Sequence, residues 1–257
     1  MHRFFVPVER IVNTDLIFPD EISHQINRVL RLKSGQKVVA LDNLGSEYLV
    51  ELTTVESGQV SGVILNKQPA GGEPQVRLFL YLCLSQRDKF EWMLQKCTEI
   101  GAAGFIPVIS SRSLVQGMEE RGNKINRWEK IIQEAAEQSG RGRIPVLQPA
   151  QKFSSAVSQA LKTHVRVLLP SPLQPDVDRV DSVSQNGIKP ALSGLTRKNQ
   201  PEIGLFIGPE GGFSEDEIAL AKSSGCIPVD LGKRILRMET AAITVSALIL
   251  YEFGEMG

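Results

Sequence analysis

The chain has 257 residues, 42% of them hydrophobic and 23% charged, which is typical of a folded globular protein. Its formal net charge is zero, which argues against a protein that binds nucleic acid through overall positive charge. The longest apolar run, residues 241–251, is far shorter than the roughly 20 residues of a membrane span, and the amino terminus lacks the apolar stretch of a signal peptide, so we expect a cytoplasmic protein that does not bind a membrane.

Residues 1–72 have the pattern of a small β-barrel domain. Runs rich in β-forming residues occur at 37–41, 47–52 and 60–64, and turn signals separate them. A short helix is expected ahead of them at 20–31, because its apolar residues share one face. A small barrel with one helix fits this pattern.

The Pro- and Gly-rich stretch at 69–74 is the best candidate for a linker, and strands alternate with helices after it. Continuous apolar runs predict strands buried on both faces of a sheet, and amphipathic runs between them predict helices. The alternation predicts an α/β domain over residues 73–257 with a mostly parallel sheet. The predicted strands are 76–84, 105–109 and 165–169, and the predicted helices run from Asp88 to Gly101 and over 126–139.

Residues 170–201 are rich in Ser, Pro, Gln and Asn and have little periodicity. This composition predicts a long surface loop. Its position beside a candidate ligand loop leaves two interpretations open, a lid and a tolerated insertion.

Two glycine-containing loops near the end of the chain carry the strongest functional signal. Residues 207–213 follow an apolar run that predicts a buried strand, and residues 231–241 follow a second run and lead into an apolar helix beginning near Thr240. Loops at the ends of strands are how an α/β sheet forms a ligand crevice. Neither loop has the spacing of a Walker or Rossmann phosphate loop, so they suit an adenosine-like ligand. Tight turns that only join strands to helices are the alternative.

These loops resemble the signature of the SPOUT RNA methyltransferases, and within them the RsmE family, which methylates N3 of a uridine in 16S ribosomal RNA. The resemblance is carried by Gly208-Pro209-Glu210-Gly211-Gly212, Leu231-Gly232 and residues 234–241. Residues 171–200 depart from the family's pattern because they are longer. Further stretches similar to the family are 3–6, His24 with 29–32, 89–101 and 127–141.

The resemblance implies a PUA-like RNA-binding β-barrel in residues 1–72 and a SPOUT α/β domain in residues 73–257. The second domain would hold S-adenosylmethionine in a deep trefoil knot, and the protein would be a homodimer acting on 16S rRNA in the small ribosomal subunit. Carried over by position, the cofactor would lie between one strand end and the two loops. The expected cofactor-binding residues are Leu169, Pro170, Ile207, Gly208, Pro209, Gly211, Gly212, Leu231, Gly232, Ile235, Leu236 and Thr240.

Methyl transfer from a sulfonium to uridine N3 requires in-line positioning and loss of the N3 proton, but neither a metal nor a covalent intermediate. Arg237 is a candidate for stabilising the developing anion, and Glu210 or Glu239 for accepting the proton. Each carboxylate has a structural alternative: Glu239 could favour the helix dipole, and Glu210 could hold its loop by hydrogen bonds. The three histidines do not cluster and the three cysteines have no paired spacing, so we expect neither a metal site nor a disulfide.

The charge is unevenly distributed along the chain: residues 1–200 carry 25 Lys or Arg against 20 Asp or Glu, and residues 201–257 carry four against nine. A basic first part permits RNA contact, although an ordinary mixed surface explains it equally well. Two rival functions remain, ribose 2′-O methylation by another SPOUT enzyme and a non-catalytic RNA-binding ribosome assembly factor. The expected RNA-binding residues are Arg3, Arg10, Arg28, Arg31, Lys33, Arg141 and Arg143.

Overall fold

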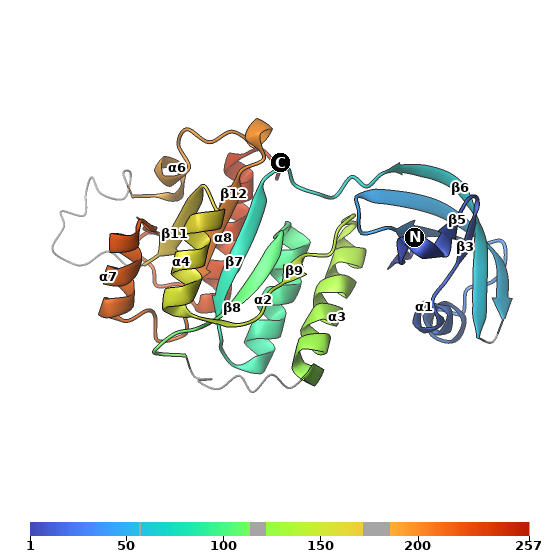
Figure 1. Cartoon of the computed structure of the whole chain (residues 1–257), viewed down its shortest axis with the longest axis horizontal. Helices are drawn as coiled ribbons and strands as arrows, with labels where there is room; N and C mark the ends of the chain where they lie inside the picture. The colour runs from blue at the N-terminus through green and yellow to red at the C-terminus, as the bar shows by residue number, and fades with distance from the viewer. Residues whose placement is uncertain (57, 114–121, 172–185, 257) are drawn as a thin grey trace. The chain divides into compact units, whose positions relative to one another are not determined.

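The computed structural model describes residues 1–56, 58–113, 122–171 and 186–256 (Figure 1). The chain divides into two compact units. Unit 1 comprises Met1–Glu73 and Gln133–Ile144, and unit 2 comprises Pro74–Ile132 and Pro145–Gly257. Each unit contains one sheet, which determines where its side chains lie.

Unit 1 is built on a six-stranded sheet in the order β1-β4-β5-β6-β3-β2. β1 pairs with β4 in parallel and the other neighbours are antiparallel. Two register shifts interrupt the long β5–β6 hairpin, and such bulges bend a strand. The strands are β1 (Arg3–Phe5), β2 (Ile11–Val12), β3 (Asp15–Ile17), β4 (Lys37–Leu41), β5 (Ser46–Glu56) and β6 (Gln59–Pro69).

The helix expected at 20–31 is shorter than the apolar pattern predicts. α1 spans Asp20–His24 and continues as a single π-helical turn, Gln25–Val29. Ile26 remains fully buried across this change, in a core that includes Phe4, Leu16 and Val50. The apolar face is thus as expected, although the helical period changes along it.

The end of a helix predicted for the α/β domain belongs to unit 1. α3 spans Gly122–Ser139, and its residue Ala136 packs in a small cluster with Phe5, Val39 and Leu41. The Glu137 carboxylate accepts a hydrogen bond from the backbone N–H of Phe5 (3.0 Å), and burial raises the pKa of this carboxyl. The end of α3 therefore completes a hydrophobic cluster beside β1 and β4.

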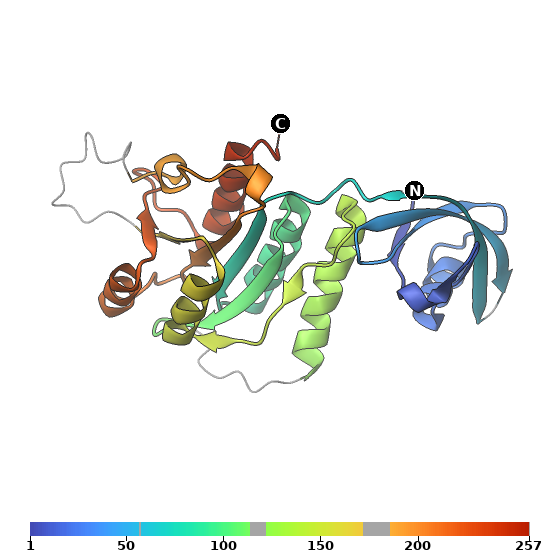
Figure 2. The same ribbon diagram turned by 45° about the horizontal axis from the view of Figure 1, so that its top comes forward.

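Unit 2 contains a sheet whose seven described strands are all parallel, as the alternating pattern predicts. The order is β10-β8-β7-β12-β11-β13, with β9 pairing on β8 (Figure 2). The central strands are buried almost completely, which explains their continuous apolar runs. The strands are β7 (Arg77–Cys83), β8 (Gly104–Ile109), β9 (Val146–Leu147), β10 (Gln151–Lys152), β11 (Arg166–Pro170), β12 (Glu202–Ile207) and β13 (Ile227–Val229).

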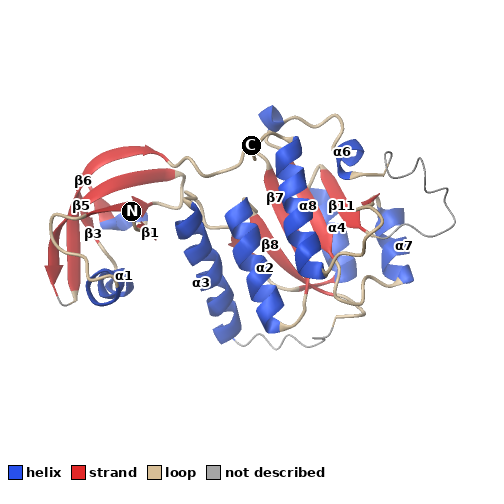
Figure 3. Cartoon of the chain, turned by 180° about the vertical axis from the view of Figure 1, so that it is seen from behind, coloured by secondary structure: helices blue, strands red, loops and turns tan. Residues whose placement is uncertain are grey.

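Helices cover both faces of this sheet. α2 packs against α8 on one face, which Figure 3 shows from the front, and α4 packs against α7 on the other, seen in Figure 1. Phe90 of α2 contacts Trp128 of α3 with ring centroids 4.5 Å apart. The three cysteines, Cys83, Cys97 and Cys226, are buried and unbonded. The helices are α2 (Arg87–Ile100), α4 (Phe153–Thr163), α7 (Glu215–Ser224) and α8 (Met238–Glu252).

Part of the long loop expected at 170–201 has regular secondary structure. A short helix, α6 (Ile188–Ala191), lies within it, and a 3-10 turn follows at Arg197–Asn199. Ile188 and Leu192 are buried, and α6 packs on α8. The expectation of a loop is thus wrong for α6 and the 3-10 turn, although most residues of 186–200 are exposed as expected. Residues 172–185 of that loop lie outside the described residues.

Within the described ranges, none of the helices has the length and apolar character needed to cross a bilayer. Over those same ranges, no group of three or more His, Cys, Asp or Glu is placed to bind a metal ion. The trefoil knot implied by the resemblance stays a prediction.

Candidate functional site

The parallel order of unit 2 brings the candidate loops to one edge of the sheet. β12 lies between β7 and β11, and β13 pairs with β11 on its other side. Because all these strands run in the same direction, the segments that follow Ile207, Pro170 and Val229 emerge at the same edge. The two loops and the Leu169-Pro170 strand end, which the sequence places far apart, are therefore neighbours.

The first loop, residues 208–214, is fixed by a tight turn and a buried ring. The backbone N–H of Gly212 donates to the Pro209 carbonyl (2.8 Å), and Gly212 has φ +68°, which favours glycine. A Cβ at Gly208 would lie 3.2 Å from the Phe213 ring, so the chain passes close to that side chain. Phe213 is buried against Phe153 of α4, with ring centroids 5.0 Å apart.

The second loop, residues 230–237, exposes several of its side chains. Gly232 has φ +91°, and its N–H donates to the Asp230 carboxylate (3.1 Å). Ile235 is 92% exposed, the highest value among the exposed large apolar side chains of the described residues. Leu231 and Leu236 are half-buried. A loop that presents apolar side chains and backbone groups in this way can contact a planar, largely apolar ligand.

The helix after this loop begins earlier than the sequence predicts. α8 begins at Met238, Arg237 is its N-cap residue, and Thr240 lies in the first turn, where it is exposed. The expected start near Thr240 is therefore two residues late. Arg237 makes no side-chain capping hydrogen bond, and its side chain is exposed at the positive end of the helix. Buried Met238 explains the earlier start, since it extends the apolar face of α8 by two residues.

The two candidate carboxylates lie in different environments. Glu210 forms an ion pair with Lys89 of α2, with Oε1 and Nζ 3.3 Å apart. Glu239 has a buried Oε2 that makes no hydrogen bond among the described residues. Because a buried acceptor without a donor costs free energy, an orphaned oxygen in a candidate site fits a donor supplied by a ligand. Sequence reasoning missed Lys89 as a partner of Glu210 because the two are 121 residues apart.

The candidate RNA-binding residues are all in unit 1, but they differ in accessibility. The Arg3 guanidinium pairs with Glu47, and the Arg141 side chain is only 3% exposed and bound to the Glu73 carboxylate through both Nε (3.1 Å) and Nη2 (2.8 Å). Arg143 is exposed but donates to the Leu44 carbonyl (2.6 Å). These contacts favour a structural role for Arg141 over the expected RNA contact. The other exposed members of the set are Arg10, Arg28, Arg31 and Lys33.

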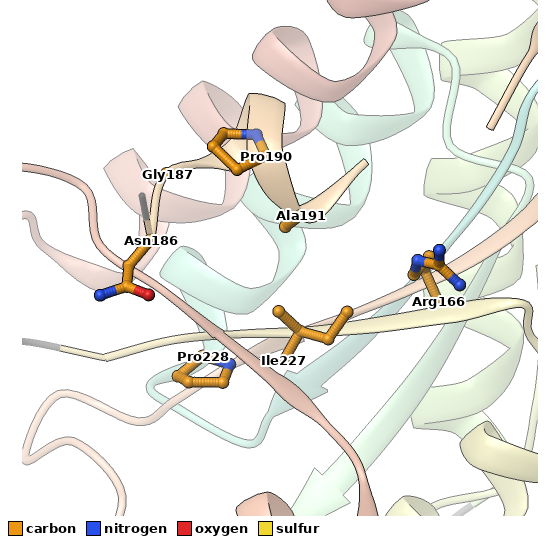
Figure 4. Close-up of a pocket in the computed structure, with 7 residues that line it drawn as sticks. All are labelled: Arg166, Asn186, Gly187, Pro190, Ala191, Ile227 and Pro228. Atoms are coloured by element: carbon orange, nitrogen blue, oxygen red, sulfur yellow. The ribbon is translucent and has the colours of Figure 1, made fainter. Parts of the chain in front are cut away.

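A pocket of about 260 Å³ lies between α6 and the starts of β11 and β13 (Figure 4). Its charged group is Arg166, whose Nη1 donates to the neighbouring Val165 carbonyl (3.0 Å). None of the candidate cofactor residues lines it. The pocket is formed by Arg166, Asn186, Gly187, Pro190, Ala191, Ile227 and Pro228.

Comparison with known proteins agrees with this architecture. The family model of an RNA methyltransferase PUA domain matches residues 18–65, and that of an RNA methyltransferase domain matches residues 72–250. The chain is 32% identical over 250 residues to ribosomal RNA small subunit methyltransferase E from Synechocystis, covering 96% of this chain and 77% of the relative. The chain belongs to this methyltransferase E family. The enzyme of the same name from Bacillus subtilis is 29% identical, over 98% of this chain and 97% of its own.

Solved structures of similar proteins contain the expected cofactor. Methyltransferase E from Neisseria gonorrhoeae, bound to S-adenosyl methionine, superposes with a TM-score of 0.81 at 28% identity, over 98% of this chain and 97% of that one. A putative methyltransferase from Legionella pneumophila, in complex with the same cofactor, gives 0.79 at 29% identity, over 97% and 96%. The match confirms the predicted combination of a PUA domain and a parallel α/β domain for this member of the methyltransferase E family.

Proposed function

We propose that this chain transfers the methyl group of S-adenosylmethionine to N3 of a uridine in the 16S rRNA of the small ribosomal subunit. The observation that carries the proposal is the pair of loops, 208–214 and 230–237, at neighbouring parallel strand ends in a member of the methyltransferase E family. In this proposal, residues 1–72 bind RNA, residues 73–257 carry the chemistry, and the reaction takes place in the cytoplasm.

The residues at this edge of the sheet fit the cofactor. Backbone groups of Gly208, Leu231 and Leu236 would hold the adenosyl part, between the two loops and the Leu169-Pro170 strand end. The orphaned Oε2 of Glu239 fits a site whose hydrogen bonds are completed by a ligand. When bound, the cofactor supplies an electrophilic methyl group.

The protein's own residues would then prepare the uridine. N3 carries a proton and is a poor nucleophile until that proton leaves, so a base and a stabilising charge are needed. We assign the base to Glu239, because the Lys89 ammonium already engages Glu210. Arg237, exposed at the start of α8, would stabilise the negative charge that develops on the uracil ring as N3 loses its proton. Glu210 then serves to hold its loop.

Labelled methyl transfer tests the proposal. The protein is incubated with S-adenosylmethionine labelled in its methyl group and with small ribosomal subunits that lack the modification. We expect label in the 16S rRNA, and no transfer to RNA would contradict the proposal. A protein that binds the subunit but not the cofactor in calorimetry would instead be an assembly factor, and label on a ribose would indicate 2′-O methylation.

We also propose that the protein is a homodimer. Trp92 of α2 and Leu248 and Tyr251 of α8 are 44%, 43% and 63% exposed, and the two helices pack side by side in unit 2. An apolar face of this kind is typical of a surface that another chain covers. Light scattering should give twice the monomer mass, and Tyr251→Asp should shift the population toward monomer. A wild-type protein that is monomeric at micromolar concentration would contradict the proposal.

A further inference from the structure

Loop 208–214 is held from outside by a residue that the proposed mechanism does not use. Arg112 lies in the turn after β8, and its Nη1 donates to the carbonyl oxygens of Gly211 (3.1 Å) and Phe213 (3.5 Å). In the sheet, β7 separates β8 from β12, so this side chain joins the ends of two strands that do not pair. We propose that Arg112 is a positioning residue that sets the conformation of the cofactor loop, an inference that rests on the proposed function.

The Arg112 contacts fix two peptide groups of the loop. In a trans peptide the C=O and the following N–H point in opposite directions, so holding both ends fixes the plane. The Gly211 carbonyl is held by Arg112, and the N–H of Gly212 on the same peptide donates to the Pro209 carbonyl (2.8 Å). The orientation of this peptide is therefore determined from both sides.

The second peptide is fixed in the same way. The Phe213 carbonyl faces Arg112, and the N–H of Ser214 on that peptide donates to Oε2 of Glu217 (2.9 Å). The other oxygen of Glu217 accepts a hydrogen bond from the backbone N–H of Ser111 (2.8 Å). Arg112 thus holds the loop directly, and Ser111 of the same turn holds the end of the loop through Glu217.

Glycine makes such external support necessary. Gly211 and Gly212 have wide conformational freedom, and ordering them costs more entropy than ordering other residues. A Cβ at Gly211 would lie 3.7 Å from Cβ and Cδ of Arg112, so the arginine stem packs directly over the glycine backbone. An arginine suits this task because the Nη1 amino group of its guanidinium carries two N–H bonds and can donate to both carbonyls. Without it, the loop would sample conformations that do not bind the cofactor.

The test compares Arg112→Ala and Arg112→Lys with Arg197→Ala in the full chain. Arg197 is an exposed arginine in the turn ahead of β12, at the opposite end of that strand from the loop, and serves as the matched control. Cofactor affinity is measured by calorimetry without RNA, KM for small ribosomal subunits by methyl transfer, and folding by thermal melting. The thermal melting of each variant is measured first. If Arg112→Ala fails to fold, the cofactor affinity of Arg112→Lys is compared with that of wild type instead.

We expect Arg112→Ala to weaken cofactor binding about tenfold, with KM for the subunits within about twofold of wild type. Arg112→Lys should recover part of the loss, since one ammonium can reach one carbonyl, and Arg197→Ala should bind like wild type. Unchanged cofactor affinity in both Arg112 variants would overturn the inference, as would a loss confined to KM for the subunits, which would make Arg112 an RNA contact. Failure of the wild-type protein to bind the cofactor would instead refute the proposed function.

Discussion

Acid should destabilise unit 2 because a neutral histidine is buried in it. His164 stacks on Phe79 with ring centroids 4.9 Å apart, its Nε2 is 3.0 Å from the Tyr81 hydroxyl, and its side chain is only 4% exposed. Burial, and then the nearby Arg77 cation, lowers the pKa of His164 to about 4. The Glu202 carboxylate is 3.8 Å from Nδ1, but it is already paired with Arg77 and does not offset the burial.

The sign and size of the effect follow from proton binding. In the unfolded chain His164 has its ordinary pKa of 6.5, so between pH 6.5 and pH 4 the unfolded state binds a proton that the folded state excludes. The free energy of unfolding therefore falls as the pH falls through this window and levels off below it. At about 1.4 kcal/mol per pKa unit, the free energy of unfolding falls by about 3 kcal/mol across the whole window.

Denaturant unfolding at pH 7 and pH 4.5 measures this contribution. In His164→Phe the ring keeps its stacking partner but cannot be protonated, so the loss of stability between the two pH values should be about 2–3 kcal/mol smaller than in wild type. His24→Gln, at an exposed histidine, is the matched control and should behave like wild type. The same loss in His164→Phe and wild type, or a pKa of His164 near 6.5 by NMR, would refute the reasoning.

Three further predictions concern the catalytic edge of the sheet. Glu239→Gln should lower single-turnover methylation about 10²- to 10⁴-fold and Glu210→Gln far less; the reverse order would move the base to Glu210. Arg237→Ala should lower turnover about 10²-fold while the cofactor Kd from calorimetry changes little, and equal losses in both would make Arg237 a binding residue. Gly208→Ala places a Cβ 3.2 Å from the Phe213 ring, so the cofactor Kd should rise several-fold, and an unchanged Kd would show that the loop can adjust.

The parallel sheet could be predicted from the sequence because its signals are local. Strands buried on both faces give continuous apolar runs, such as the one in β7 (Arg77–Cys83), and their alternation with amphipathic segments indicates the class of fold. The two glycine loops were placed correctly at strand ends for the same reason. The start of α8 was predicted two residues late, because Met238 can extend either the loop or the helix in a sequence pattern.

The features that could not be predicted depend on contacts between distant residues. α3 has one amphipathic pattern, yet Trp128 packs with Phe90 in unit 2 and Ala136 packs with Phe5 in unit 1. Periodicity shows that a face is buried but not what covers it. Arg141 likewise has the sequence signature of a surface cation, but its buried side chain is bound to Glu73, 68 residues away.

Mass spectrometry of the modified nucleoside tests the central claim most directly. Small ribosomal subunits that lack the modification are incubated with the protein and S-adenosylmethionine, and the 16S rRNA is then digested to nucleosides. The account predicts one new species, uridine methylated on N3, formed by wild type and nearly lost with Glu239→Gln. A methyl group on the ribose, on another base, or on no nucleoside at all would contradict it.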